Sequence, residues 1–286
     1  MDIEIKTIAI AGAGTMGQGI AISCALAGYT TKIFDANESA CERGFAMIDK
    51  NFKQLVEKGK LDAVASAQAL SKITISTEVV QLKADLVLEA IAENLEAKQN
   101  LFKTTEEINN GAAILATNTS SLSVTKIAAG LNYPAHCAGL HFFNPAHVMK
   151  LVEVVAGERT ALSVLTALKA FAKSIGKVTV DAKDSPGFIV NRVARHFYVE
   201  SLLAVEKNAT SFETVDALMR ASGFRMGPFE LMDLIGIDVN YAVTESVYLG
   251  FNKAEKFRPS PVQKEKIDNA ELGRKSGKGF YAYSQK

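Results

Sequence analysis

The feature that most constrains the fold of this sequence is a glycine-rich stretch directly after an apolar run near the start of the chain. The apolar run is Thr7–Ala11, and a helical apolar pattern follows at Ile20–Leu26. In such a strand–turn–helix unit the first glycine permits a tight turn, the second lets the backbone approach a pyrophosphate, and the third lets helix and strand pack closely. The spacing predicts a dinucleotide-binding turn made of Gly12, Ala13, Gly14, Thr15, Met16 and Gly17.

An acidic residue stands at the end of the next predicted strand. This strand covers Thr31–Phe34, and Asp35 follows it. A carboxylate about 20 positions after the glycine turn can accept hydrogen bonds from a ribose 2′-hydroxyl, and its charge would repel the 2′-phosphate of NADP. We therefore expect NAD as the cofactor and Asp35 as one of its contacts. A helix cap is the alternative role for this carboxylate.

Short apolar runs alternate with longer amphipathic stretches up to about residue 183, which is typical of βα units on a parallel sheet. The stretch from Asn37 to about Leu70 contains no strand-like run and predicts a long helical excursion. Strands are predicted at Thr7–Ala11, Thr31–Phe34, Lys72–Ile75, Leu86–Ala90, Ile114–Thr117, Ala138–Phe142, Lys150–Val155 and Val178–Val180.

The pattern changes after Ser185-Pro186-Gly187, where apolar residues begin to recur at helical spacing and strand-like alternation stops. Proline and glycine together favour a break between two parts of a chain. We therefore expect a Rossmann-type α/β domain over residues 1–183 and an all-α domain over residues 184–286.

The balance of charges excludes several classes of partner. Lys and Arg number 32 against 31 Asp and Glu, a net charge of +1, so no global field draws nucleic acid or an anionic membrane. No run of about 18 apolar residues predicts a membrane span.

The cysteines Cys24, Cys41 and Cys137 lack CxxC spacing, which argues against disulfides and a metal site. The apolar run so near Met1 leads us to expect no signal or transit segment, and a cytoplasmic protein.

A histidine and a glutamate interrupt two of the predicted buried strands. His141 lies within Leu140–Phe143, and Glu153 interrupts Leu151–Val155. A carboxylate inside such an apolar run is costly unless it is paired. If the two strands are neighbours, Glu153 can bind one ring nitrogen of His141 and leave the other facing the cofactor. The pattern fits a general base at His141 and a satisfied core histidine equally well.

Two further polar segments are candidates for contacts with a substrate. Asn118–Ser121 follows a buried strand, so it is expected at the carboxyl edge of the sheet, where open α/β proteins bind ligands. Its hydroxyl and amide groups can stabilise an oxyanion, and a helix cap is the other interpretation. Asn191 lies in the first apolar helix of the second half, either as a solvated residue or as a group sent towards the ligand.

Taken together, these motifs resemble the 3-hydroxyacyl-CoA dehydrogenase family over essentially the whole chain, and in particular its short single-function members. The resemblance implies NAD-dependent, reversible oxidation of an L-3-hydroxyacyl-CoA to a 3-ketoacyl-CoA, in fatty-acid or short-chain acyl-CoA metabolism. It also implies a homodimer formed through the helical domain. The motifs are Gly12–Ala21, Glu89–Asn94, Asn118–Leu122, His141–Pro145, Lys150–Val154, Pro186–Arg192, Arg225–Asp238 and Gly277–Tyr281.

The resemblance also implies roles for individual residues. His141 would be the general base and Glu153 the carboxylate that orients it, while Ser120 and Asn191 would contact the 3-oxygen of the substrate. Further cofactor contacts would be Glu93, Lys98, Ser120, Asn144 and Lys275. Asn51 and Lys58 lie where family members contact coenzyme A, although the family has serine in place of Asn51.

The predicted helical excursion carries a local positive patch, formed by Lys50, Lys53, Lys58 and Lys60. The phosphates of coenzyme A could bind there, and a solvated helix face is the alternative. Two other functions stay open for the chain: a dehydrogenase of the same architecture that acts on a free hydroxy acid, and a dinucleotide-binding protein without catalysis.

Overall fold

The computed structural model describes residues 3–284. The chain forms two compact units, divided between Asp184 and Ser185. The first unit is an α/β unit and the second is helical, so the predicted fold class is confirmed. Across the described residues, no helix combines the length and the apolar character that a bilayer crossing requires.

The first unit is built on one eight-stranded sheet in the order β3-β2-β1-β4-β5-β6-β7-β8. The chain adds strands outward on one side of β1 and then returns to add the others from β4 onward. In open sheets of this kind, ligands bind outside the carboxyl ends of the strands at the point where the order reverses, here between β1 and β4. The strands are β1 (Thr7–Ala11), β2 (Thr30–Phe34), β3 (Ile73–Ser76), β4 (Leu86–Glu89), β5 (Ile114–Thr117), β6 (Cys137–Phe142), β7 (Leu151–Ala156) and β8 (Val178–Lys183).

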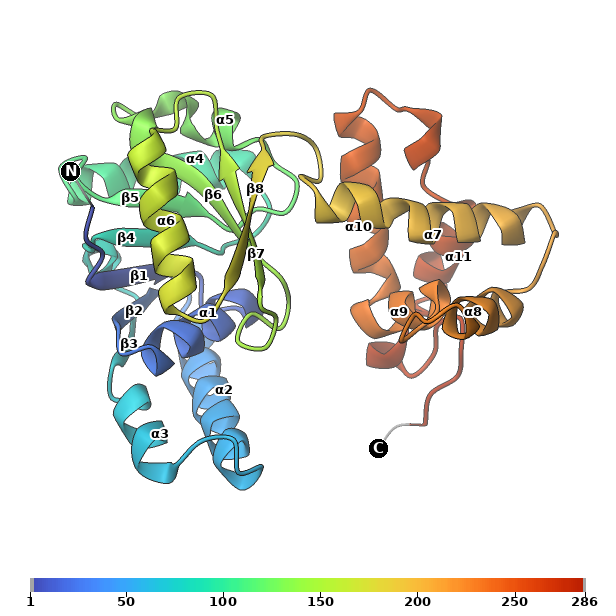
Figure 1. The fold of residues 1–286 in the computed structure, drawn as a ribbon, viewed down its shortest axis with the longest axis horizontal. Helices are drawn as coiled ribbons and strands as arrows, with labels where there is room; N and C mark the ends of the chain where they lie inside the picture. The colour runs from blue at the N-terminus through green and yellow to red at the C-terminus, as the bar shows by residue number, and fades with distance from the viewer. Residues whose placement is uncertain (1–2, 285–286) are drawn as a thin grey trace. The chain divides into compact units, whose positions relative to one another are not determined.

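Helices connect and cover these strands (Figure 1). The predicted helical excursion is present and consists of two helices, α2 and α3, which lie side by side and project beyond the sheet. Their break follows Glu57, and Asp62 then caps α3 by accepting from the N–H groups of Val64 and Ala65. The helices of this unit are α1 (Thr15–Leu26), α2 (Glu38–Glu57), α3 (Ala63–Leu70), α4 (Leu95–Ile108), α5 (Val124–Ile127) and α6 (Leu162–Ser174), with 3-10 turns at Val79–Leu82, Ala128–Gly130 and Pro134–His136.

The core of the first unit lies along the central strands. Ile8 and Ile10 of β1 and Leu86 and Leu88 of β4 have no exposed surface. Helices cover both faces of such a sheet, so its strands are apolar along their whole length rather than alternating. This explains why the predicted runs coincide with the observed strands to within about two residues at most ends.

The predicted parallel sheet is present except at one pair of strands. β7 pairs antiparallel to β6, whereas the other neighbouring strands run parallel. Only residues 143–150 connect the two strands, and a parallel crossover needs about a dozen residues or more. The short connection forces a reversal, and the reversal places His141 directly opposite Glu153.

The second unit packs helices around a core that includes Leu202, Phe229, Met232, Ile237 and Phe280. Phe280 belongs to the closing aromatic segment, which α9 holds in place. The helices of this unit are α7 (Val190–Glu206), α8 (Phe212–Ala221), α9 (Pro228–Ile235), α10 (Ile237–Gly250) and α11 (Pro261–Asp268), with 3-10 turns at Glu255–Phe257 and Arg274–Ser276.

A buried carboxylate on α9 explains how that segment is held. Asp233 is 1% exposed and accepts hydrogen bonds from the N–H groups of Phe280 and Tyr281 and from the hydroxyl of Tyr283. Burial is the main cause that raises the pKa of Tyr283 to about 12, with the bond to Asp233 acting in the same direction. The final glycine-rich motif therefore folds back onto the helical core.

Candidate active site

The glycine turn after β1 has the backbone geometry that a dinucleotide site requires. Gly12 has φ of +111°, and a Cβ there would lie 2.5 Å from the carbonyl oxygen of Ala90 at the end of β4. A Cβ on Gly17 would lie 1.9 Å from the carbonyl oxygen of Gly12. At Gly14, by contrast, a Cβ would meet nothing within 4 Å. The first and third glycines thus permit close packing, while the second faces open space where a pyrophosphate can approach.

The start of α1 completes an anion site at this turn. Gly14 is the N-cap residue, it supplies no side-chain cap, and the first turn carries no acidic residue. The first N–H groups of a helix lack partners within the helix, and the helix dipole is positive there. A phosphate group can bind these donors without displacing a capping side chain.

Two cavities lie on either side of the turn and share Gly14. One has a volume of about 440 Å³ and lies at the switch point of the sheet, between the ends of β1, β2 and β4. Asp35 lines it, as do Gly12 and Ala90. Its position fits the adenosine half of a dinucleotide.

The carboxylate of Asp35 is tied to the glycine turn. It accepts from the N–H of Ala13 at 2.9 Å and from the N–H of Asn37 at 3.0 Å. The cap of α2 is Asn37, whose side chain accepts from the N–H of Ala40. Asp35 therefore does not cap α2, and its carboxylate lines the 440 Å³ cavity.

The second cavity has a volume of about 540 Å³ and lies between the start of α1, one face of α2 and the loop after β6. Asn51 and Asn144, both predicted contacts, line it together. Arg43 also lines this cavity, two helical turns before Asn51 on the same face of α2. The cavity thus brings the predicted coenzyme A region next to the glycine turn.

The lysines predicted on α2 have separate surroundings. Lys53 pairs with Asp49 at 2.7 Å along the same helix, and its side chain is 70% exposed. Lys58 is the C-cap residue of α2 and is exposed. Their predicted contacts with a substrate stay predictions.

The predicted contact between the buried acid and the histidine is present. Nδ1 of His141 lies 2.7 Å from Oε2 of Glu153, across the antiparallel pair of β6 and β7. Glu153 has no exposed surface and His141 is 5% exposed. The ring of Phe143 lies 4.6 Å from that of His141. Because an ionised carboxylate can only accept, this contact fixes a proton on Nδ1 of the neutral ring.

A second cross-strand contact braces the end of β6. The side-chain oxygen of Asn118, just after β5, accepts from the N–H of Phe142 at 2.8 Å. Phe142 follows His141 directly, so the amide holds the strand end that carries the imidazole. The side-chain oxygen of Asn118 is therefore used in a hydrogen bond to the backbone of β6.

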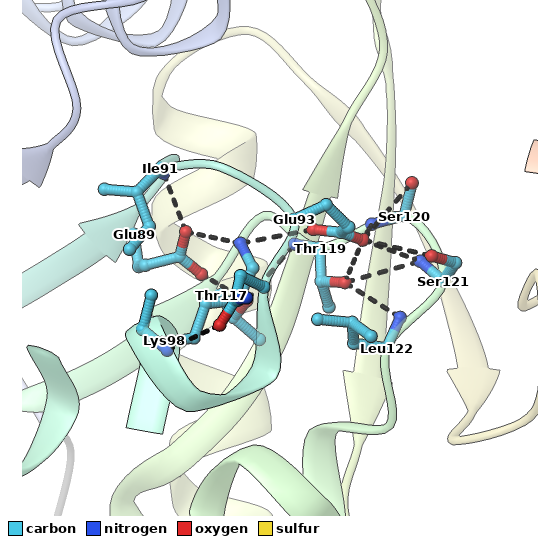
Figure 2. Close-up of polar contacts among 11 residues, drawn as sticks. Glu89, Ile91, Glu93, Lys98, Thr117, Thr119, Ser120, Ser121 and Leu122 are labelled. Carbon is cyan, nitrogen blue, oxygen red and sulfur yellow. Dashed lines mark hydrogen bonds and ion pairs between the residues drawn. The ribbon is translucent and has the colours of Figure 1, made fainter. Parts of the chain in front are cut away.

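The carboxylate of Glu93 accepts several hydrogen bonds from the turn that follows β5 (Figure 2). Its Oε1 accepts from the hydroxyl of Thr119 at 2.5 Å and from the N–H groups of Ser120 at 3.0 Å and Ser121 at 3.2 Å. Its Oε2 lies 3.2 Å from Nζ of Lys98. Burial acts to raise the pKa of Glu93, but the ammonium of Lys98 and these hydrogen bonds outweigh it and hold the pKa below its usual value. The predicted cofactor residues Glu93, Lys98 and Ser120 are thus brought together.

The remaining predicted residues lie in the second unit. Asn191 is in the first turn of α7, and its carbonyl oxygen accepts from Nε of Arg195 at 3.2 Å. Nζ of Lys275 pairs with Asp238. Their predicted contacts with the 3-oxygen and the cofactor stay predictions.

Three residues that line or support these sites escaped the sequence analysis. Arg43 gives no signal of its own, because a charged residue on an amphipathic helix is ordinary. Thr119 lies within a predicted segment but was not singled out. Glu89 begins the motif Glu89–Asn94, but no role is predicted for it there; the signal for one is that it ends the apolar run Leu86–Glu89 in the same way that Glu153 interrupts its strand.

Comparisons with known proteins agree with this geometry. Residues 7–185 match the family model of the 3-hydroxyacyl-CoA dehydrogenase NAD binding domain, and residues 187–283 match that of the C-terminal domain. The match to an NAD binding domain confirms the predicted cofactor.

Individual relatives match almost the whole chain. A 3-hydroxyadipyl-CoA dehydrogenase of Escherichia coli K12 is 45% identical over 98% of this chain, which spans only 60% of that relative. A probable 3-hydroxybutyryl-CoA dehydrogenase of Bacillus subtilis 168 is 40% identical, with 99% of each chain covered. The crystal structure of (S)-3-hydroxybutyryl-CoA dehydrogenase PaaH1 from Ralstonia eutropha has a TM-score of 0.93 at 38% identity, covering 99% of this chain and 100% of that one. The chain therefore belongs to the 3-hydroxyacyl-CoA dehydrogenase family.

Proposed function

We propose that this protein oxidises an L-3-hydroxyacyl-CoA to the 3-ketoacyl-CoA with NAD⁺, and runs the reaction in reverse with NADH. The observation that carries the proposal is the 2.7 Å contact between buried Glu153 and Nδ1 of His141, near the carboxyl end of β6 in a dinucleotide-binding sheet. The relatives named after 3-hydroxyadipyl-CoA and 3-hydroxybutyryl-CoA support the substrate class.

The first unit supplies most of the groups that are proposed to hold the cofactor. The N–H groups at the glycine turn bind the pyrophosphate, and Asp35 accepts from the adenosine ribose. Glu93, Lys98, Ser120, Asn144 and Lys275 are proposed as further contacts. NAD⁺, when bound, would supply the acceptor for the hydride at C3 of the substrate. The residues of this chain would then position the substrate and transfer the proton of its 3-hydroxyl.

His141 accepts the proton of the 3-hydroxyl as the hydride departs. The ring becomes an imidazolium, and the carboxylate of Glu153, which has no exposed surface, stabilises that charge at 2.7 Å. In the reverse direction the same imidazolium returns the proton to the 3-ketone. Ser120 and Asn191 are proposed to bind the 3-oxygen and so hold C3 in place.

The face of α2 is proposed to bind coenzyme A. Asn51 lines the 540 Å³ cavity, and Lys58 and Lys53 follow it towards the end of the helix. Of these, Lys58 is the better candidate for a phosphate contact, because Asp49 already neutralises part of the charge of Lys53.

The setting of the enzyme is also part of the proposal. We place it in the cytoplasm, in fatty-acid or short-chain acyl-CoA metabolism including β-oxidation, as a homodimer that associates through its helical unit. Exposed apolar side chains of that unit, among them Leu234, Ile235 and Val239, are compatible with an interface.

The direct test is NADH formation from a series of 3-hydroxyacyl-CoA thioesters of increasing length, assayed beside the matching free 3-hydroxy acids. The proposal predicts turnover of thioesters and at most trace turnover of free acids. Turnover of free acids alone would make the enzyme a hydroxy-acid dehydrogenase, and no turnover with either would remove the catalytic assignment.

Replacing the proposed base tests its role. His141→Gln should lower kcat roughly 10²–10⁴-fold, the usual worth of general acid–base catalysis, while NADH binding stays within about twofold. The measurements are steady-state kinetics and a fluorescence titration with NADH. His136→Gln, at a histidine bound to the carbonyl oxygen of Gly111, serves as the control. Turnover near the wild-type rate in His141→Gln would defeat the assignment.

The cofactor preference should depend on Asp35. Asp35→Ala removes an acceptor for the 2′-hydroxyl and the charge that opposes a 2′-phosphate, so the KM for NAD⁺ should rise more than that for NADP⁺. We expect the ratio of kcat/KM values to move towards NADP⁺ by roughly tenfold or more. An unchanged ratio would exclude Asp35 from cofactor discrimination.

Reversing a charge at the end of α2 tests the coenzyme A contact. Lys58→Glu should raise the KM for the acyl-CoA severalfold and leave the KM for NAD⁺ unchanged, because a carboxylate repels a phosphate. The control is Lys72→Glu, which makes the same change of charge at an exposed lysine just before the amino end of β3. Equal KM values for acyl-CoA in the two variants would exclude Lys58.

A further inference from the structure

Glu89 is a buried carboxylate that the proposed reaction does not use. It is the last residue of β4 and has no exposed surface. Its Oε1 accepts from the N–H of Ile91 at 2.7 Å, and its Oε2 accepts from the hydroxyl of Thr117 at 2.7 Å. Thr117 is the last residue of β5, and Ile91 lies in the loop directly after β4, so the ends of two neighbouring strands set the position of this carboxylate.

An ammonium group binds the same carboxylate. Nζ of Lys98, on the first turn of α4, lies 2.5 Å from Oε1 of Glu89, and the lysine is 1% exposed. A buried cation is tolerated only where it is paired. The same Nζ lies 3.2 Å from Oε2 of Glu93, so Lys98 joins a carboxylate inside the sheet to one near its surface. Two of its three N–H donors are directed at these carboxylates, which leaves at most one for a cofactor.

The chain of contacts ends at the turn that carries Ser120. Figure 2 shows Glu93 between Lys98 on one side and Thr119, Ser120 and Ser121 on the other. The two oxygens of Glu93 are divided between these partners, Oε2 towards Lys98 and Oε1 towards the turn. A change in the position of Lys98 therefore moves Glu93, and with it the backbone of Ser120.

We propose that Glu89 is a positioning residue that fixes Lys98, and thereby holds Glu93 and the Ser120 turn in the geometry required by the cofactor and the substrate. The group comprises two carboxylates and one ammonium. Without the charge of Glu89, Lys98 would pair with Glu93 alone and draw it away from the turn. The effect on turnover rests on the proposed function, whereas the effect on NADH binding does not.

The test compares Glu89→Gln with a matched variant on the same helix as Lys98. Glu106 is 6% exposed, and its carboxylate accepts from the N–H groups of Asn132 and Tyr133. Glu106→Gln therefore makes the same change at a buried carboxylate outside the site. Both variants should lower Tm. Only Glu89→Gln should raise the Kd for NADH, by roughly tenfold, and lower kcat/KM by roughly tenfold to a hundredfold, as misplacement by a fraction of an ångström to an ångström does.

A double mutant shows whether Glu89 acts through Lys98. In a Lys98→Met background the Glu89→Gln change should have no further effect on the Kd for NADH, because the group that carries the effect is gone. The proposal would be overturned if the two changes raised the Kd for NADH additively in the double mutant. It would also be overturned if Glu89→Gln had the same Kd for NADH and the same kcat/KM as Glu106→Gln. A purely structural role would lower Tm in both single variants and leave the two Kd values equal.

A milder variant covers the case in which Glu89→Gln does not fold. Thr117→Val removes one donor to Glu89, together with the acceptor of the N–H of Thr119 at 3.2 Å, without a change of charge or shape. It should raise the Kd for NADH severalfold, and an unchanged Kd there would also overturn the proposal. If the wild type binds NADH but oxidises no acyl-CoA, the proposed function fails, while these binding measurements still decide the role of Glu89.

Discussion

The buried pair of Glu153 and His141 is the interaction on which the account of this protein depends. An acid without exposed surface in an apolar strand requires a partner. The partner lies directly opposite because β7 pairs antiparallel with β6 in the register that matches His141 with Glu153. A connection of eight residues is too short for a parallel crossover. The local topology and the proposed chemistry therefore have the same origin, a short loop between two buried strands.

The same principle recurs on the neighbouring strands. Glu89 is the last residue of β4, and both of its carboxylate oxygens accept hydrogen bonds. Glu153 lies within β7, and its Oε2 lies at Nδ1 of His141. Asn118 and Glu93 then tie the ends of β5 and β6 and the following turn to these strands. Burying these polar groups in an apolar sheet would be costly if they were unpaired. Because they bind one another, they also fix the positions of the strand ends at the carboxyl edge of the sheet.

Much of the fold could be predicted from the sequence because its signals are local. The glycine turn, the apolar strands and the change of pattern after Ser185 each depend on neighbouring residues. The contact of His141 with Glu153 could be predicted because burying a lone carboxylate is costly. The antiparallel β7 was missed because apolar runs carry no direction. Arg43 and the role of Asn118 depend on segments far apart in the chain, which a single sequence does not bring together.

The protonation of His141 tests the central claim most directly. Nitrogen NMR of the full chain with labelled histidine, at a pH where the ring is neutral, reports which ring nitrogen carries the proton. The contact with Glu153 predicts a proton on Nδ1, and Glu153→Gln should weaken that preference. A neutral ring that carries its proton on Nε2 in the wild type would contradict the account, because Nε2 could not then accept a proton from the substrate.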